Sequence, residues 1–269
     1  MATKKPMGTV TRGTTNPNRL RRVDRFIATL PVLKSAESPL VVDLGYGASP
    51  ITAVELLARL SQVNSATTVI GIEIERERVE RGLAVAHEKL LFGLGGFETP
   101  LPDPLARQAP VDVIRAFNVL RQYDESEVAD AWAMMQSRLS PDGWLIEGTC
   151  DEIGRLSSWV VLDRSGPRAL TIALRLASIG SAGLETPSAV AERLPKALIH
   201  HNLPGERIHS YLNDLDVAWR NAAGLAPFGA TQRWMATCEA MVAAGWPVRT
   251  DRKRWRLGEL TVDWAAVAP

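Results

Sequence analysis

The chain has 269 residues, of which 46% are hydrophobic and 23% are charged, and its formal net charge is +1. This composition predicts a globular protein with one large domain, or one domain with a substantial extension. It argues against a polycation, and the unpaired cysteines Cys150 and Cys238 argue against a disulfide framework or a zinc site. No apolar run approaches the roughly 20 residues of a membrane helix, and no secretory signal is visible, so we expect a cytoplasmic protein.

The predicted elements alternate between strands and helices. We expect strands over residues 40–44, 68–74, 97–99, 111–117 and 144–149. We expect helices over residues 18–30, 51–60, 75–91 and 125–139, the last ending at the turn 140–143. Strands at 159–162 and 169–174 flank a turn and form a hairpin. The chain is therefore expected to be an α/β protein with a Rossmann-like sheet of mostly parallel strands and a terminal antiparallel hairpin.

The pattern becomes mainly helical after about residue 180. Helices are expected over 187–198, 204–223 and 228–244, followed by a hairpin around the turn 251–254. We therefore predict three parts: an N-terminal basic segment and helix (1–37), a Rossmann-like domain (38–178), and a helical extension with a C-terminal hairpin (179–269).

Positive charge is concentrated in two stretches. Residues 1–25, which include Lys4, Lys5 and Arg12, hold seven basic residues against one acid, and residues 249–256 hold five against one. Such stretches bind phosphates in some proteins and form solvated surface in others. We favour solvated surface, and phosphate binding stays open as the alternative.

The segment from Leu40 to Pro50 carries the most informative motif. A predicted strand reaches Asp43 and Leu44, and Gly45 and Gly47 follow before a helix. This arrangement lets backbone N–H groups approach a nucleotide-like ligand. The spacing Asp-x-Gly-x-Gly differs from the Gly-x-Gly-x-x-Gly of dinucleotide sites. It resembles the first motif of class I S-adenosylmethionine (SAM)-dependent methyltransferases, in which the glycines let the backbone pass close to the methionine part of the cofactor.

Later positions extend the resemblance. Glu73 ends the second strand, where the family has the acid that binds the ribose hydroxyls; the alternative is a surface glutamate. Asn118 follows the fourth strand, where it would bind the cofactor or the substrate, or would simply end the strand and cap a turn. Residues 139–145 are similar to the family pattern L-x-P-G-G-x-L, with Asp142 in place of one glycine.

The resemblance covers residues 38–176 and implies methyl transfer from SAM to an acceptor that the sequence does not identify. It assigns no catalytic residue. We expect no metal, because no carboxylate has metal-ligand spacing from the pair His200-His201. A carboxylate at Asp43 is electrostatically suited to the cationic methyl donor. The implied cofactor-binding residues are Asp43, Gly45, Tyr46, Gly47, Glu73, Ile74 and Asn118. In the N-terminal segment, Asn16, Arg19 and Arg22 lie either near this site or on the outside of the domain.

Two alternative functions remain. In an RNA-modifying methyltransferase, the two basic stretches would follow phosphates and Trp255 would stack on bases, although the small net charge disfavours nucleic acid as a partner. A non-catalytic methyltransferase-like binding protein would retain the fold alone. No membrane partner is expected, and the oligomeric state is not predicted.

Overall fold

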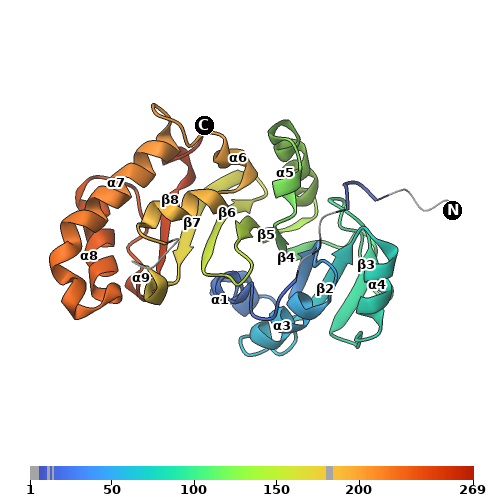
Figure 1. The fold of residues 1–269 in the computed structure, drawn as a ribbon. Coiled ribbons are helices and arrows are strands. Elements are labelled where there is room, and N and C mark those ends of the chain that lie inside the picture. The colour runs from blue at the N-terminus through green and yellow to red at the C-terminus, as the bar shows by residue number, and fades with distance from the viewer. Residues whose placement is uncertain (1–5, 11–12, 14, 180–183) are drawn as a thin grey trace. The chain divides into compact units, whose positions relative to one another are not determined.

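The computed structural model describes residues 6–10, 13, 15–179 and 184–269. Its strands form one eight-stranded sheet in the order β3-β2-β1-β4-β5-β6-β7-β8 (Figure 1). The strands are β1 (Leu40–Leu44), β2 (Thr68–Glu73), β3 (Leu90–Leu94), β4 (Val111–Phe117), β5 (Leu139–Cys150), β6 (Leu156–Asp163), β7 (Gly166–Leu174) and β8 (Glu259–Asp263). The pairs β1–β2, β2–β3 and β1–β4 are parallel, and β7–β8 is antiparallel. The predicted α/β class with a Rossmann-like sheet is confirmed.

Helices precede, connect and follow these strands. They are α1 (Arg21–Ile27), α2 (Val32–Ser35), α3 (Ile51–Leu60), α4 (Arg76–Leu83), α5 (Val128–Gln136), α6 (Lys196–Ile199), α7 (Arg207–Asn221), α8 (Ala230–Ala243) and α9 (Arg252–Arg256). Short 3-10 turns occupy residues 120–122, 125–127, 176–178, 187–193, 222–228 and 264–266.

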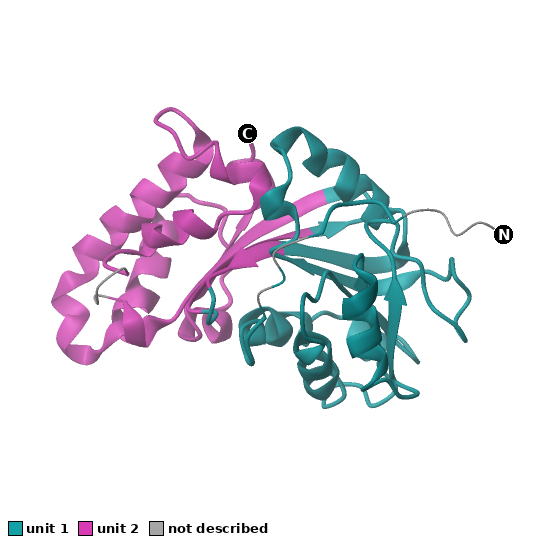
Figure 2. Ribbon diagram, turned by 45° about the vertical axis from the view of Figure 1, so that its right-hand side comes forward, with its two compact units in different colours: residues 1–147, 152–154, 162–166 teal, residues 148–151, 155–161, 167–269 magenta. Residues whose placement is uncertain are grey.

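The chain divides into two compact units (Figure 2). Unit 1 comprises residues 1–147, 152–154 and 162–166, and unit 2 comprises residues 148–151, 155–161 and 167–269. Strand β5 contributes residues to both. The division of the chain at 37/38 and 178/179 stays a prediction.

Unit 1 is built on strands whose sequences are almost continuously apolar. Val41, Val42, Ile70 and Ile114 are completely buried, as expected for parallel strands that are covered on both faces. From β1 the chain runs through α3 to β2 and through α4 to β3, and β4 then pairs with the other side of β1. The strand order therefore reverses between β1 and β4, and ligands of open α/β sheets bind at the carboxyl ends of the strands at such a point.

Unit 2 combines a hairpin with a helical pair. The turn between β6 and β7, whose residues 163–165 belong to unit 1, is held by the backbone N–H and the hydroxyl of Ser165, which both donate to Asp163. Helices α7 and α8 pack against each other (Figure 1). Their contact buries Tyr211 of α7 together with Trp234 and Cys238 of α8.

The region around residue 90 differs from the prediction. The helix expected over 75–91 ends at Leu83, and Leu90 and Leu91 lie in β3, paired with Val69 and Ile70 of β2. The strand expected over 97–99 is a loop. The apolar residues of 75–91 have helical spacing, so the predicted helix is too long. In the structure Leu90 and Phe92 are buried residues of the edge strand β3.

Two turns were also predicted wrongly. Residues 140–143 lie within β5. Residues 252–256 form α9, because the Asp251 side chain accepts hydrogen bonds from the backbone N–H groups of Lys253 and Arg254 and caps that helix. The expected C-terminal hairpin is reduced to a bridge between Val248 and Val262, and β8 pairs along its length with β7.

Candidate functional site

A hollow that is partly open to solvent lies in unit 1, where the strand order reverses. Residues at the carboxyl ends of β1, β2, β3 and β4 line it, together with residues from the N-terminal segment. Its wall consists of Met7, Gly8, Thr9, Leu44, Gly45, Ile72, Glu73, Ile74, Gly95, Gly96, Phe97, Val119 and Tyr123. No lysine or arginine is among these described wall residues, so the described wall has no basic side chain to bind a phosphate.

Gly45 brings bare backbone to the wall of the hollow. Its φ is +69°, a conformation that favours glycine. Its N–H donates to the carbonyl of Ile72 at 2.8 Å and so joins the ends of β1 and β2. A Cβ at this position would lie 2.6 Å from Cγ2 of Val119. The position therefore requires glycine for both its conformation and its closeness to Val119.

Glu73 places a buried carboxylate at the carboxyl end of β2, and only 2% of the residue is exposed. One oxygen accepts from the backbone N–H of Ile74 at 2.6 Å, and the other accepts from Arg78 at 2.8 Å. A carboxylate has about four acceptor positions, so these bonds leave capacity for hydroxyl donors. The alternative of a surface glutamate is wrong.

Asp43 lies outside the wall and is turned toward other side chains. It is 2% exposed and accepts from the hydroxyl of Thr52 at 2.8 Å and from Nε of Arg115 at 3.0 Å. Arg115 also pairs with Asp24 of α1. Burial raises the pKa of Asp24 to about 6, and Arg115 and Arg59 oppose that rise. The acid of the glycine motif is thus part of a buried ionic cluster.

Tyr46, Gly47 and Asn118 also lie outside the wall. The Tyr46 hydroxyl donates to the carbonyl of Arg78 at 2.8 Å, and burial raises the pKa of this phenol. A Cβ on Gly47 would lie 2.9 Å from the carbonyl oxygen of Gly13. Asn118 follows β4 with a φ of +61°, next to Val119. Of the seven predicted cofactor-binding residues, the wall contains three, Gly45, Glu73 and Ile74, and the binding role of all seven stays a prediction.

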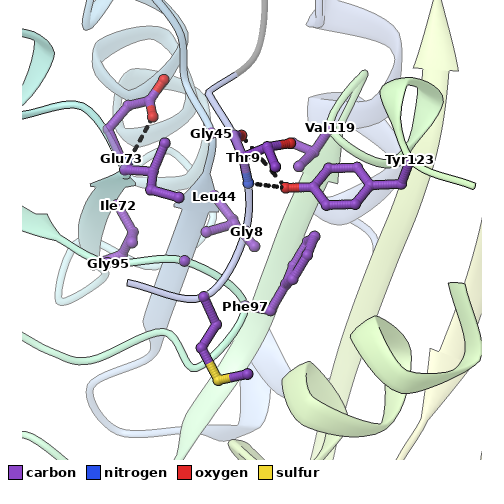
Figure 3. Close-up of a pocket in the computed structure, with 13 residues that line it drawn as sticks. Gly8, Thr9, Leu44, Gly45, Ile72, Glu73, Gly95, Phe97, Val119 and Tyr123 are labelled. Carbon is purple, nitrogen blue, oxygen red and sulfur yellow. Dashed lines mark hydrogen bonds between the residues drawn. The ribbon is translucent and has the colours of Figure 1, made fainter. Parts of the chain in front are cut away.

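Sequence reasoning missed the aromatic side of the hollow. The rings of Phe97 and Tyr123 are 5.2 Å apart and tilted by 60°. Figure 3 shows these two rings on one side of the Gly8–Thr9 segment and Glu73 on the other. The backbone N–H of Phe97 donates to the carbonyl of Met7 at 3.0 Å. In the sequence, the signal for this aromatic side is Phe97 directly after the pair Gly95-Gly96, where a strand is predicted instead.

Two arginines of the N-terminal basic stretch bind backbone carbonyls. Arg21 donates to the carbonyls of Asn18 and Ile153, and Arg22 donates to that of Gly154. Asn16 donates to the carbonyl of Glu152. These bonds tie the segment to the turn at 152–154. Lys4, Lys5 and Arg12 lie outside the described residues.

The second basic stretch does not present an aromatic platform. Trp255 is 3% exposed, and its indole N–H donates to the carbonyl of Arg249 at 3.1 Å. The expectation that Trp255 stacks on bases is therefore wrong. Arg252 and Arg254 pair with Glu239 and Glu259.

The described residues contain no group of three or more His, Cys, Asp or Glu side chains placed to hold a metal ion. Nor do they include a helix with the length and apolar character needed to cross a bilayer. Cys150 and Cys238 are buried, and neither forms a disulfide.

No protein-family model and no curated protein matches the chain. Solved structures with a similar fold include an O-methyltransferase family 2 protein of Planctomyces limnophilus (20% identity, 48% of this chain and 39% of that chain, TM-score 0.37). A SAM-dependent methyltransferase of Leishmania major has 17% identity over 49% of each chain, with a TM-score of 0.34. Human N-acetylserotonin methyltransferase, solved with SAM, has 19% identity over 51% of this chain and 36% of that chain, with a TM-score of 0.35.

The matched region thus spans less than half the length of each of these three proteins. All three TM-scores lie below 0.4, and the comparisons assign the chain to no family.

Proposed function

We propose that this chain is a methyltransferase that binds SAM in the hollow of unit 1. The observation that carries the proposal is the meeting of Gly45 and Glu73 in one wall, at the carboxyl ends of β1 and β2 beside the reversal of strand order. Bare backbone and a buried acid at these places suit a nucleoside with a ribose diol. The absence of basic side chains from the described wall fits a ligand without phosphates better than a dinucleotide.

Within this proposal, each group has a distinct task. Glu73 would accept hydrogen bonds from the ribose hydroxyls, and the backbone at Gly45 would lie against the methionine part. Phe97 and Ile74 offer apolar surface. SAM, when bound, would supply an electrophilic methyl group. Proximity and orientation can account for much of the rate of such a transfer, so the proposal assigns no general base.

Calorimetry with SAM tests the proposal directly. We expect saturable binding, and we expect Glu73→Ala to weaken it by roughly 1–3 kcal/mol, because a buried hydrogen-bonding partner of the ligand is lost. Glu75→Ala is the matched control, since Glu75 also pairs with Arg78, at 2.6 Å, but is not part of the wall. Absence of heat and of a thermal shift with millimolar SAM would exclude the proposed function. Equal losses in the two variants would exclude the ribose role of Glu73.

A further inference from the structure

One guanidinium is bonded to both ends of the glycine turn. Arg115 lies on β4, completely buried, opposite Asp43 in the parallel β1–β4 register. Its Nε donates to Oδ1 of Asp43 at 3.0 Å, and its Nη2 lies 2.6 Å from Oδ2 of the same carboxylate. Nη2 also donates to the carbonyl of Thr52 at 3.0 Å. Asp43 precedes the turn 45–50 and Thr52 follows it. The side chain of Arg115 therefore binds the residues on both sides of the turn.

Two further contacts complete this cluster. The hydroxyl of Thr52 donates to Oδ2 of Asp43 at 2.8 Å, which joins the two anchor points directly. Nη1 of Arg115 pairs with Asp24, which also pairs with Arg59 at 2.8 Å. Arg59 also pairs with Glu55 at 3.3 Å, so the cluster contains three carboxylates and two guanidiniums. Although burial disfavours the charged guanidinium, Asp43 and Asp24 outweigh this effect and raise the pKa of Arg115.

Stability alone is a poor explanation for such a cluster. Buried ion pairs are costly to desolvate, and well-packed apolar side chains often replace them without loss of stability. A guanidinium differs from an apolar side chain in that its planar group holds a carboxylate in one orientation. The turn needs external anchoring, since Gly45 and Gly47 both have positive φ and have no side chains to pack.

We infer that Arg115 is a positioning residue, which holds the glycine turn in the geometry that binds the cofactor without itself reaching the pocket wall. The inference rests on the proposed SAM site. Through Asp24, the same guanidinium links the turn to helix α1. Loss of Arg115 then weakens the binding of the methionine part of SAM, which lies against the turn. The binding of the ribose beside Glu73 is unchanged.

A comparison of two ligands separates positioning from general stability. SAM carries the amino-acid end that the turn would contact, whereas 5′-methylthioadenosine has the nucleoside and the sulfur but lacks that end. We expect Arg115→Met to lower the affinity for SAM by about tenfold or more, because misplacement of a binding group by about 1 Å is costly. The affinity for 5′-methylthioadenosine should change less than about threefold. Arg115→Lys should fall between, because an ammonium cannot reproduce the fork.

Arg59→Met is the matched control. Arg59 bonds to Asp24, Glu55 and Asn18 rather than to Asp43 or Thr52. We expect this variant to leave the ratio of the two affinities unchanged even where it lowers the melting temperature. Without any ligand, amide hydrogen exchange at residues 45–48 should be faster in Arg115→Met than in Arg59→Met, with equal exchange in β2.

If Arg115→Met does not fold, Thr52→Val provides the second variant, since it removes only the hydroxyl that joins Thr52 to Asp43. It should shift the affinity ratio in the same direction by a smaller factor. The inference is overturned if wild type binds both ligands and no variant changes their ratio, or if the exchange of residues 45–48 is the same in the two arginine variants. A wild-type protein that binds neither ligand overturns the proposed function instead, and the exchange comparison then still decides whether Arg115 holds the turn.

Discussion

The phenolic oxygen of Tyr123 lies 2.5 Å from the backbone nitrogen of Thr9, a residue 114 positions earlier in the chain. The bond ties the N-terminal segment to the loop after β4, and both residues line the hollow at the carboxyl ends of the strands. On the other side of the segment, Met7 bonds to the loop after β3 through the N–H of Phe97. The N-terminal segment is therefore a wall of the candidate site.

Removal of one hydroxyl tests this attachment. In Tyr123→Phe the N–H of Thr9 loses its acceptor, and a net loss of about 1 kcal/mol corresponds to roughly fivefold faster opening. We expect amide exchange at Thr9 and Phe97 to accelerate by about that factor, as measured by NMR. Tyr46→Phe is the control, because it loses the bond to Arg78 but leaves the Thr9 attachment intact. Equal protection of Thr9 in wild type and Tyr123→Phe would show that the bond does not hold the segment.

A methyl group at Gly96 should disturb the same wall from the opposite side. The added Cβ would collide with the carbonyl of Met7, whose displacement breaks the bond to Phe97. We expect Gly96→Ala to lose about 1–3 kcal/mol of unfolding free energy, as for other overpacked sites. Gly224→Ala has open space around its Cβ and should be neutral or slightly stabilising. Urea denaturation measures both, and a Gly96→Ala protein as stable as Gly224→Ala contradicts the prediction.

Glu147 should make the stability of the protein depend on pH. Burial raises the pKa of this β5 carboxyl to about 8, and the polar N–H of Trp132 partly opposes the rise. Between pH 4.5, the ordinary pKa of a glutamate, and about pH 8, the folded state keeps a proton that the unfolded state has released. Stability therefore decreases as the pH rises through this window.

In Glu147→Gln this contribution disappears, so its unfolding free energy should decrease less than that of wild type between pH 6 and pH 8. The expected difference is about 2–3 kcal/mol, the linkage value for one proton over two pH units. Denaturant titrations at several pH values measure it, with Glu77→Gln as an exposed control. Parallel pH profiles for wild type and Glu147→Gln would refute the assignment of a protonated Glu147.

Local signals predicted the sheet of unit 1 well. The strands at 40–44 and 111–117 and the helix at 51–60 have the predicted bounds, because each combines an apolar run with clear flanking turn or cap residues. Glu73 was distinguished from its helical neighbours by its isoleucine flanks, and it is the acid that is buried.

Features that depend on residues distant in sequence were not predictable. Nothing around Thr9 marks it as a partner of Tyr123, and Arg115 reads locally as a strand residue rather than as the partner of Asp43 and Asp24. The strand at Leu90 was not predicted, because its apolar residues continue the helical spacing of the preceding helix and few turn residues mark where the strand begins. Trp255 is buried by β8 and α9 packing that composition does not specify.

The pairing of both motif acids with arginines has a consequence for how a cation would arrive at the site. Asp43 faces Arg115 and Glu73 faces Arg78, so each negative charge has a positive partner within 2.8 Å. Such pairs have weak fields at a distance, and long-range attraction of a sulfonium ligand is correspondingly small. We expect the association rate of SAM, followed by stopped-flow fluorescence, to change little between about 0.1 M and about 1 M salt. A steep decrease in that rate would mean that capture of the ligand depends on unscreened charge elsewhere on the surface.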